Sequence, residues 1–386
     1  DPKISCPAYD EYDMDNSKAR AQWLTTLWQA QAYGQKMHPI HAMRWHMNVS
    51  ARAVARLIWT GTMADDTSKG TLPPILIQPL EPINVGFKDG LYYPHWIYHR
   101  YSDDVRSVLK RYPEAKTKVT ERFGDGWDKP GRARKMVTVT DFWYCDDAGK
   151  KHKINNVILV DDHIVKEYLD LPYPRIPIFV KLNDPAPLND ELWSNGSILS
   201  GQYETWQTMN QLASMHLTAT KENFWPETNL VSEEGEEIPD INKGRGETNV
   251  FPRGTKALGA LSSPPNVQLS SSLMDVLASQ QQQATFPAAL YGDPGAMRSA
   301  YGYSMMTGAG LSRIGDTIFQ LQQLCQDVNS TALCMFKKFG DSPVTLYGYD
   351  KANNKMYGST LAPDQIGDRY DNTGTLNNNM PGDGMQ

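Results

Sequence analysis

The stretch LSRIGDTIFQLQQLCQDVNSTALCMFKKFG, residues 311–340, carries the clearest periodic pattern in the sequence. Its apolar side chains recur at alternating intervals of three and four residues, at Leu311, Ile314, Ile318, Leu321, Cys325, Val328, Ala332, Met335 and Phe339. This spacing places all of them on one face of an α-helix, and Gly340 ends the run. The pattern predicts a long amphipathic helix over 310–340 whose apolar face packs in a core.

The segment just before this helix has a different character. Residues 295–310, GAMRSAYGYSMMTGAG, are small, sulfur-bearing and aromatic, with several glycines and one cation, Arg298. Glycine lowers helix propensity and permits irregular backbone. We therefore expect a pliant loop over 293–309 that is joined directly to the front of a stiff helix.

The rest of the chain alternates predicted helices with predicted strands. The patterns predict helices over 17–34, 48–61 and 102–113, the last with Ser102 as its N-cap. Strands are expected over 135–145, 153–160 and 173–182, and a hairpin over 342–358. Two further helices are expected, one over 197–225 and one over 270–286 that Pro287 ends, with a polar stretch between them. These elements predict an α+β fold.

Composition and charge limit the classes of function. The chain has 386 residues, a formal net charge of −6 and no apolar run long enough to cross a bilayer. The negative net charge argues against a protein that binds nucleic acid tightly over a broad surface, because each phosphate contact needs a Lys or Arg side chain. Its four cysteines have no metal-ligand spacing, which is typical of plain thiols in a reducing compartment.

Each candidate catalytic group in the sequence also has a structural explanation that involves no catalysis. Four acidic pairs resemble parts of a two-metal site, namely Asp65-Asp66, Asp103-Asp104, Asp146-Asp147 and Asp161-Asp162. Each falls at a predicted turn or helix start, where Asp is favoured for its own hydrogen bonds. The histidines His38, His41 and His46, and also His163, have no nearby set of further ligands in the sequence.

Two charged clusters leave two interpretations open. The basic run KPGRARK at 129–135 is either a solvated loop or a contact for DNA or an acidic partner. The acidic run Glu233, Glu234, Glu236 and Glu237 is either a docking surface or a solvated loop. No nucleophile-elbow or phosphate-loop motif is present.

The order of the parts resembles the portal proteins of tailed bacteriophages. The resemblance lies in YPRIPIFVKL (173–182) leading into SILSGQYETWQTMNQLAS (197–214), and in AMRSAYGYSMMTGAGLSRI (296–314) before the long helix. The stretch LEPINVGFKDGLYYPHWIYHRYSDDVRSVLKRYP (80–113) is similar to the wing region of that family. The similarity spans most of the chain.

The resemblance implies a division of the chain into portal-like parts. These are an N-terminal wing region of helices followed by a small β-sheet (1–196), a stem helix (197–225), a small α/β clip (226–268), a second stem helix (269–292), a tunnel loop (293–309), a long wing helix (310–340) and a truncated C-terminal wing β segment (341–386). The stem departs from expectation in carrying few charges, chiefly Glu204, Lys221 and Glu222.

The resemblance also implies a role and partners. Portal proteins form a ring, here expected to have twelve subunits, at one vertex of the viral capsid, and double-stranded DNA is packaged and ejected through it without sequence-specific contacts. The implied partners are the major capsid protein, the terminase large subunit and a head–tail adaptor, with assembly in the bacterial cytoplasm and residence in the virion. No cofactor, metal, membrane contact or enzymatic activity is expected.

The implied functional residues fall in two segments. The tunnel-loop residues expected to brush passing DNA are Met297, Arg298, Ser299, Tyr301, Tyr303, Ser304, Met305 and Met306. The clip residues expected to contact terminase or adaptor are Glu233, Glu234, Glu236, Glu237, Lys243 and Arg245. Two alternatives remain, another structural ring or adaptor protein of the virion, and a metal-dependent nucleic-acid enzyme that uses the Asp pairs and His163.

Overall fold

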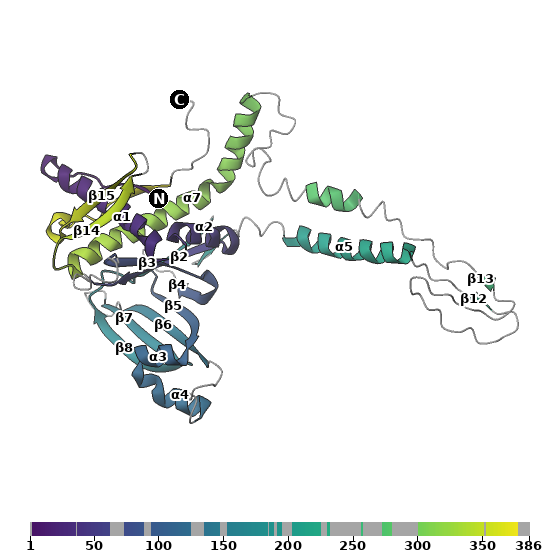
Figure 1. Ribbon diagram of the computed structural model, residues 1–386, viewed down its shortest axis with the longest axis horizontal. Coiled ribbons are helices and arrows are strands. Elements are labelled where there is room, and N and C mark those ends of the chain that lie inside the picture. The colour runs from purple at the N-terminus through teal and green to yellow at the C-terminus, as the bar shows by residue number, and fades with distance from the viewer. Residues whose placement is uncertain are drawn as a thin grey trace. The chain divides into compact units, whose positions relative to one another are not determined.

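The chain divides into two compact units, Asp1–Ile198 with Ser312–Gln386, and Leu199–Leu311. The computed structural model describes residues 2–35, 37–61, 73–88, 94–124, 135–146, 153–183, 185–188, 191–194, 203–224, 230–231, 256–257, 272–279, 300–350 and 353–376. Figure 1 shows the elements of each unit along the chain. Helices and antiparallel sheets together give a mixed α+β fold.

The first unit contains two sheets. A three-stranded sheet has the order β3 (Ile75–Leu80), β2 (Arg52–Trp59) and β9 (Ile178–Leu182). A five-stranded sheet has the order β4 (Val85–Lys88), β5 (Trp96–Asp104), β6 (Met136–Asp146), β7 (Lys153–Val160) and β8 (His163–Leu171). The short strands β10 (Pro185–Leu188) and β11 (Glu191–Ser194) form a separate pair.

Helices cover these sheets and build three hydrophobic clusters. The largest cluster joins α1 (Met14–Gly34), α2 (Pro39–Ser50) and α7 (Ala300–Phe339) to β2 and β3. A second cluster lies where residues of β2 and β9 meet Ile97, Trp143 and Ile154 of the five-stranded sheet. The third lies between that sheet and α3 (Val105–Arg111), the turn Pro113–Ala115 and α4 (Lys116–Phe123).

The C-terminal part of the first unit returns to its N-terminal part. The hairpin β14 (Val344–Asp350) and β15 (Lys355–Leu361) packs against α1 (Figure 1). The strand β16 (Thr373–Thr375) then pairs antiparallel with β1 (Lys3–Ser5). Short turns of 3-10 helix lie between β1 and α1 (Glu11–Asp13), between β15 and β16 (Pro363–Ile366) and between β3 and β4 (Pro82–Asn84). The two ends of the described chain are therefore strand partners.

A buried ion pair reinforces this closure. The Arg20 guanidinium is 1% exposed and donates to both carboxylate oxygens of Asp13, at 3.0 and 2.8 Å. Arg20 also donates to the carbonyl of Gln365 at 3.2 Å, and Arg369 approaches the Asp13 carboxylate at 2.8 Å. The hydrogen bond from Arg20 holds the pKa of Asp13 well below its usual range, although burial opposes this, and Arg369 lowers it further.

The second unit is described in four parts. They are α5 (Tyr203–Phe224), the antiparallel pair β12 (Leu230–Val231) with β13 (Lys256–Ala257), a helical stretch at 272–279, and the beginning of α7 up to residue 311. This unit covers the residues that the resemblance assigns to the stem helices, the clip and the tunnel loop.

Several predicted elements agree with the structure, and three differ from it: the helix over 48–61, the N-cap Ser102 and the loop over 293–309. The strands expected over 135–145 and 153–160, and the hairpin expected over 342–358, are confirmed by β6, β7 and β14–β15. The helix predicted over 48–61 is instead strand β2, preceded by the end of α2. Because β2 is central and buried on both faces, its apolar residues do not alternate, and such a run is also compatible with a helix. The N-cap of α3 is Asp104 rather than Ser102, since β5 runs through Asp104.

The predicted loop at 293–309 also differs from the structure. Helix α7 begins at Ala300, so 300–309 are helical, and 293–299 lie outside the described residues. Residues 300–309 contain no proline, and each glycine costs only about 1 kcal/mol relative to alanine in a helix interior. A long helix that is already nucleated by 311–339 can therefore extend backward through it.

Candidate functional site

The C-terminal half of α7 is fixed firmly in the first unit. Five of the nine residues in the predicted apolar stripe are at most 2% exposed, namely Leu321, Cys325, Val328, Ala332 and Met335. The predicted packing of this stripe in a core is confirmed for these residues. For Leu311 and Ile314 the side chains lie outside the described part of the chain.

Polar contacts fix the register of α7 as well. The buried Thr317 hydroxyl donates to Asn183 Oδ1 at 2.7 Å, and Trp28 Nε1 donates to Asn329 Oδ1 at 2.8 Å. At the surface of the helix, Lys181 pairs with Asp327 at 2.9 Å. Buried hydrogen bonds are costly to leave unmade, so these contacts favour one rotation and one height for the helix. The part of α7 from Thr317 onward is thus firmly held within the first unit.

Helix α5 is unusual in its lack of charge. From Thr205 to Thr220 the sequence TWQTMNQLASMHLTAT contains no Asp, Glu, Lys or Arg. Met215 and Leu217 are 65% and 70% exposed, and Trp206 is 42% exposed. Leu273 and Val276 of the helical stretch 272–279 are also exposed. Isolated exposed apolar residues are common, but an uncharged run of helix with several of them, as over Thr205–Thr220, is typical of a surface that associates with another chain.

The structure describes the backbone of five of the eight predicted channel residues. Tyr301, Tyr303, Ser304, Met305 and Met306 lie within α7. Met297, Arg298 and Ser299 lie outside the described residues. So do the predicted clip residues Glu233, Glu234, Glu236, Glu237, Lys243 and Arg245.

The described acidic pairs have local structural roles. Asp104 caps α3 by accepting from the Arg106 backbone N–H at 2.8 Å. Asp161 and Asp162 occupy the β7–β8 turn with positive φ, and the Asp161 carboxylate accepts from the Thr138 N–H at 3.0 Å. Asp162 pairs with Arg100 at 3.3 Å. Asp146 ends β6, while Asp147, Asp65 and Asp66 lie outside the described residues.

The histidine cluster is arranged around the start of α2. His38 is the N-cap, and its Nδ1 accepts from the Ile40 backbone N–H at 3.3 Å. Its ring packs edge to face with His41 at 5.9 Å, whereas His46 packs on Trp45. His163 begins β8 and is exposed. The basic run at 129–135 is outside the described residues except for Lys135, whose ammonium lies over the Phe123 ring at 5.8 Å.

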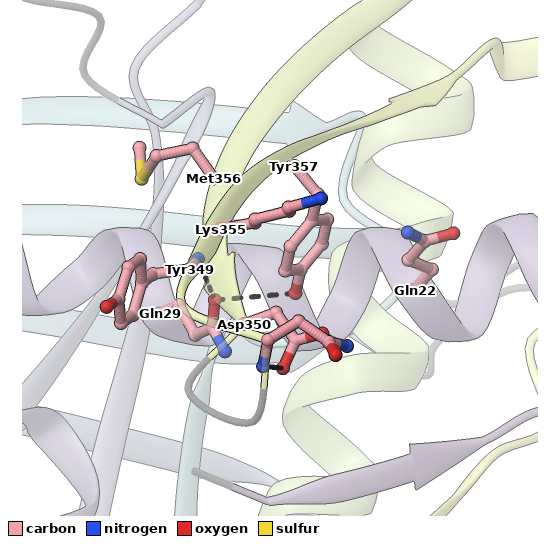
Figure 2. Close-up of a pocket in the computed structure, with 8 residues that line it drawn as sticks. Gln22, Gln29, Tyr349, Asp350, Lys355, Met356 and Tyr357 are labelled. Carbon is pink, nitrogen blue, oxygen red and sulfur yellow. Dashed lines mark hydrogen bonds between the residues drawn. The ribbon is translucent and has the colours of Figure 1, made fainter.

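Sequence reasoning missed one surface feature, an open groove between α1 and the tip of the β14–β15 hairpin (Figure 2). Its volume is about 990 Å³, and it is lined by Gln22, Gln29, Tyr349, Asp350, Asn353, Lys355, Met356 and Tyr357. No local pattern in the sequence points to it, because α1 and the hairpin are more than 300 residues apart along the chain.

Among the described residues, His, Cys, Asp and Glu side chains form no group of three that could hold a metal ion. Within the same residues, no helix is long and apolar enough to cross a membrane. No protein-family model matches the chain, and a search of curated proteins gives no significant match.

Proposed function

We propose that this chain is a portal protein, a ring-forming subunit through which double-stranded DNA enters and leaves a bacteriophage capsid. The observation that supports the proposal best is the path of the chain. It leaves the first unit after residue 198, forms α5, a small β pair and the helical stretch 272–279, and re-enters the first unit within α7 at residue 312. This order matches a stem, a clip, a second stem helix and a wing helix.

The chemistry of α5 supports the same role. A conduit must let DNA pass, and cations that neutralise phosphates release counterions and hold the duplex. Amide and hydroxyl side chains such as Gln211 and Ser214 offer only weak, sequence-independent contacts. The exposed Trp206, Met215 and Leu217 supply apolar surface for neighbouring copies, since a closed ring needs one patch of each copy to meet a different patch of the next.

Assembly state is the direct test of the ring. The purified chain of 43.4 kDa should give, by mass photometry, a single species of many subunits, and negative-stain images should show a central opening. The substitutions Met215→Glu and Leu217→Glu should abolish that species without lowering the melting temperature of the first unit. A monomer at every concentration and ionic strength would refute the proposal.

The role of the start of α7 is tested separately. The double substitution Tyr303→Ala with Met306→Ala should leave the ring intact but reduce the yield of DNA-filled heads when the variant replaces the natural protein. The matched change Tyr347→Ala, at an exposed side chain of the β14–β15 hairpin, should leave the yield unchanged. Equal yields for both variants would remove the start of α7 from the channel.

A further inference from the structure

The five-stranded sheet has one covered face and one face open to solvent. From Val137 to Tyr144 in β6, buried side chains alternate with half-buried ones, and β5 follows the same alternation from Trp96 to His99. The buried apolar side chains belong to the hydrophobic clusters formed with α3, α4 and the three-stranded sheet. Successive residues of a strand point to opposite faces, so the half-buried side chains lie on the other face, and none of them belongs to a cluster.

The composition of the open face is unusual. An antiparallel sheet with one face in solvent ordinarily carries polar side chains there. Here four aromatic residues occupy neighbouring positions, with Trp96 opposite Tyr144 and Tyr98 opposite Phe142 in the register of β5 and β6. We call these four residues the aromatic platform. Contiguous apolar surface that the fold leaves in contact with solvent is typical of a binding site.

The rings of Tyr98 and Trp96 form a flat surface. Tyr98 lies opposite Gly86 of β4, and a Cβ on Gly86 would lie 2.5 Å from the Tyr98 ring. The ring therefore rests on the β4 backbone and turns its other face to solvent. The Trp96 ring is within 13° of parallel to it at a centroid distance of 6.1 Å, and parallel rings this far apart are displaced sideways rather than stacked face to face.

Two further rings continue this surface onto β6. The centroid of Phe142 lies 6.1 Å from that of Trp96, and the centroid of Tyr144 lies 5.8 Å from that of Phe142. From β4 to β7, the sheet around these rings covers three strand spacings, or about 14 Å. The platform is thus large enough for several residues of an extended ligand.

The polar atoms of the platform are available to a ligand. Among the described residues, Trp96 Nε1 and the hydroxyls of Tyr98 and Tyr144 have no hydrogen-bond partner. An indole N–H can only donate, and each phenol has an O–H to donate. The platform therefore suits a ligand that combines apolar rings with hydrogen-bond acceptors.

The charges at the border of the platform balance one another. Lys88 lies opposite Trp96 in the register, and Asp146 lies two residues after Tyr144 on the same face. Lys153 is opposite Asp146. A nucleic acid strand is a poor match for this border, because each of its phosphates needs a cation. The ligand is accordingly expected to be close to neutral.

A proline-rich peptide has all of these properties. Proline lacks an N–H, so its segments present carbonyl acceptors between compact apolar rings. In the polyproline II conformation such a segment is already extended and loses little entropy when it docks on aromatic side chains. At about 3.1 Å per residue, four or five residues cover the roughly 14 Å from β4 to β7.

We propose that the aromatic platform binds a proline-rich segment of a different protein in the polyproline II conformation. Proline rings of the segment lie on Trp96 and Tyr98, and its carbonyls accept hydrogen bonds from Trp96 Nε1 and the Tyr144 hydroxyl. The inference rests on the first unit alone and does not depend on ring formation or on DNA.

The prolines of this chain do not supply such a segment. Two pairs have the three-residue spacing of a polyproline II turn, Pro79 with Pro82 and Pro174 with Pro177. Pro82 and Pro177 are buried in the first unit, so neither pair can leave the fold to bind a platform. Pro264 and Pro265 are adjacent in sequence and have no third proline at that spacing.

The test begins with random twelve-residue peptides displayed on their encoding mRNA and selected on the full chain. We expect the enriched peptides to share two prolines three residues apart. Replacing either shared proline with alanine should weaken binding at least about ten-fold in a fluorescence anisotropy titration. A selection that enriches nothing, or that enriches peptides without the shared prolines, would overturn the proposal.

Variants of the protein locate the binding site. Trp96→Ala should bind the selected peptides at least about ten-fold more weakly. Tyr144→Phe keeps the ring and removes a hydroxyl that has no partner among the described residues, so it should bind about three- to ten-fold more weakly with an unchanged melting temperature. The matched controls are Tyr347→Ala and Tyr347→Phe, at a tyrosine of β14 that is 58% exposed. Wild-type affinity in either platform variant, or an equal loss in its control, would overturn the proposal.

Three competitors check the class of ligand. Maltoheptaose and an oligothymidine strand should not displace a bound peptide, and displacement by either would overturn the proposal in favour of a carbohydrate or a nucleic acid. The peptide LSSPPNVQ, residues 261–268 of this chain, should bind much more weakly than the selected peptides. Equal affinity would indicate a second copy of the chain as the occupant and would also overturn the proposal.

Discussion

Removing the Asp13 carboxylate should destabilise the first unit strongly. In Asp13→Asn the shape is kept, but the Arg20 cation, only 1% exposed, loses the carboxylate to which it donates twice. Breaking a buried ion pair by removing one partner costs about 3–5 kcal/mol, because a charge is left buried without compensation. For a unit of this size each kcal/mol lowers the melting temperature by about 2–4 °C, so we expect a fall of roughly 6–20 °C.

The matched control for this change is Asp10→Asn. Asp10 accepts from the Asp13 backbone N–H at 2.8 Å, which an asparagine oxygen can also do, and its ion pair with Arg369 at 3.4 Å is exposed. Exposed pairs contribute little, so this variant should melt close to the wild type. Differential scanning calorimetry on both variants is the measurement. A fall in Asp13→Asn no larger than in Asp10→Asn would refute the reasoning.

The pH dependence gives a second check on the same pair. The pKa of Asp13 is lowered on folding, so its contribution is complete above its unfolded pKa of about 4. The contribution declines as the pH falls below that value, because the unfolded carboxyl takes up a proton first. The stability difference between the wild type and Asp13→Asn should therefore stay constant from pH 7 to 5 and shrink in stronger acid.

Other predictions concern one histidine and two glycines. Burial, aided by the charge of Arg56, lowers the pKa of His99. The neutral His99 therefore stabilises the fold above about pH 6.5, and this contribution is lost as the pH falls. In His99→Gln, the free energy of unfolding measured in urea should fall less between pH 6.5 and 5. Gly315→Ala should raise stability by about 0.5–1 kcal/mol, because a Cβ there meets nothing within 4 Å and alanine favours the helix, and a lower melting temperature would contradict this. Gly348→Ala should cost about 1–3 kcal/mol, because its Cβ would lie 2.5 Å from Gln29 Oε1, and an unchanged melting temperature would show that the hairpin shifts freely.

The elements that sequence reasoning found were those with a strong local pattern. The apolar stripe ending at Phe339 is periodic over many turns, and only one packing direction satisfies it. Strands β6 and β7 are bounded by a clear turn signal and one of their faces is buried. Local chemistry was sufficient in both cases.

The features that sequence reasoning missed depend on parts of the structure outside the local sequence. Strand β2 is buried by α2 and α7 on one side and by the five-stranded sheet on the other, and of these α7 and the sheet are distant from β2 along the chain. The first residues of α7 are weak helix formers that are carried by the anchored half of the same helix. The groove at Lys355 depends on the meeting of α1 with the hairpin, which only the tertiary fold determines.

The pairing of β1 with β16 has a consequence for biosynthesis. At ribosomal speeds of about 5–20 residues per second, Thr373–Thr375 are made roughly 20–70 s after Lys3–Ser5. Until then β1 has no strand partner, Arg20 lacks the Gln365 carbonyl to which it donates, and Asp13 lacks its ion pair with Arg369. The five-stranded sheet over residues 85–171 and the inserted segment 199–311 are complete earlier, so translation delays chiefly the contacts that join the two flanks, namely the packing of α7 on α1 and the pairing of β1 with β16.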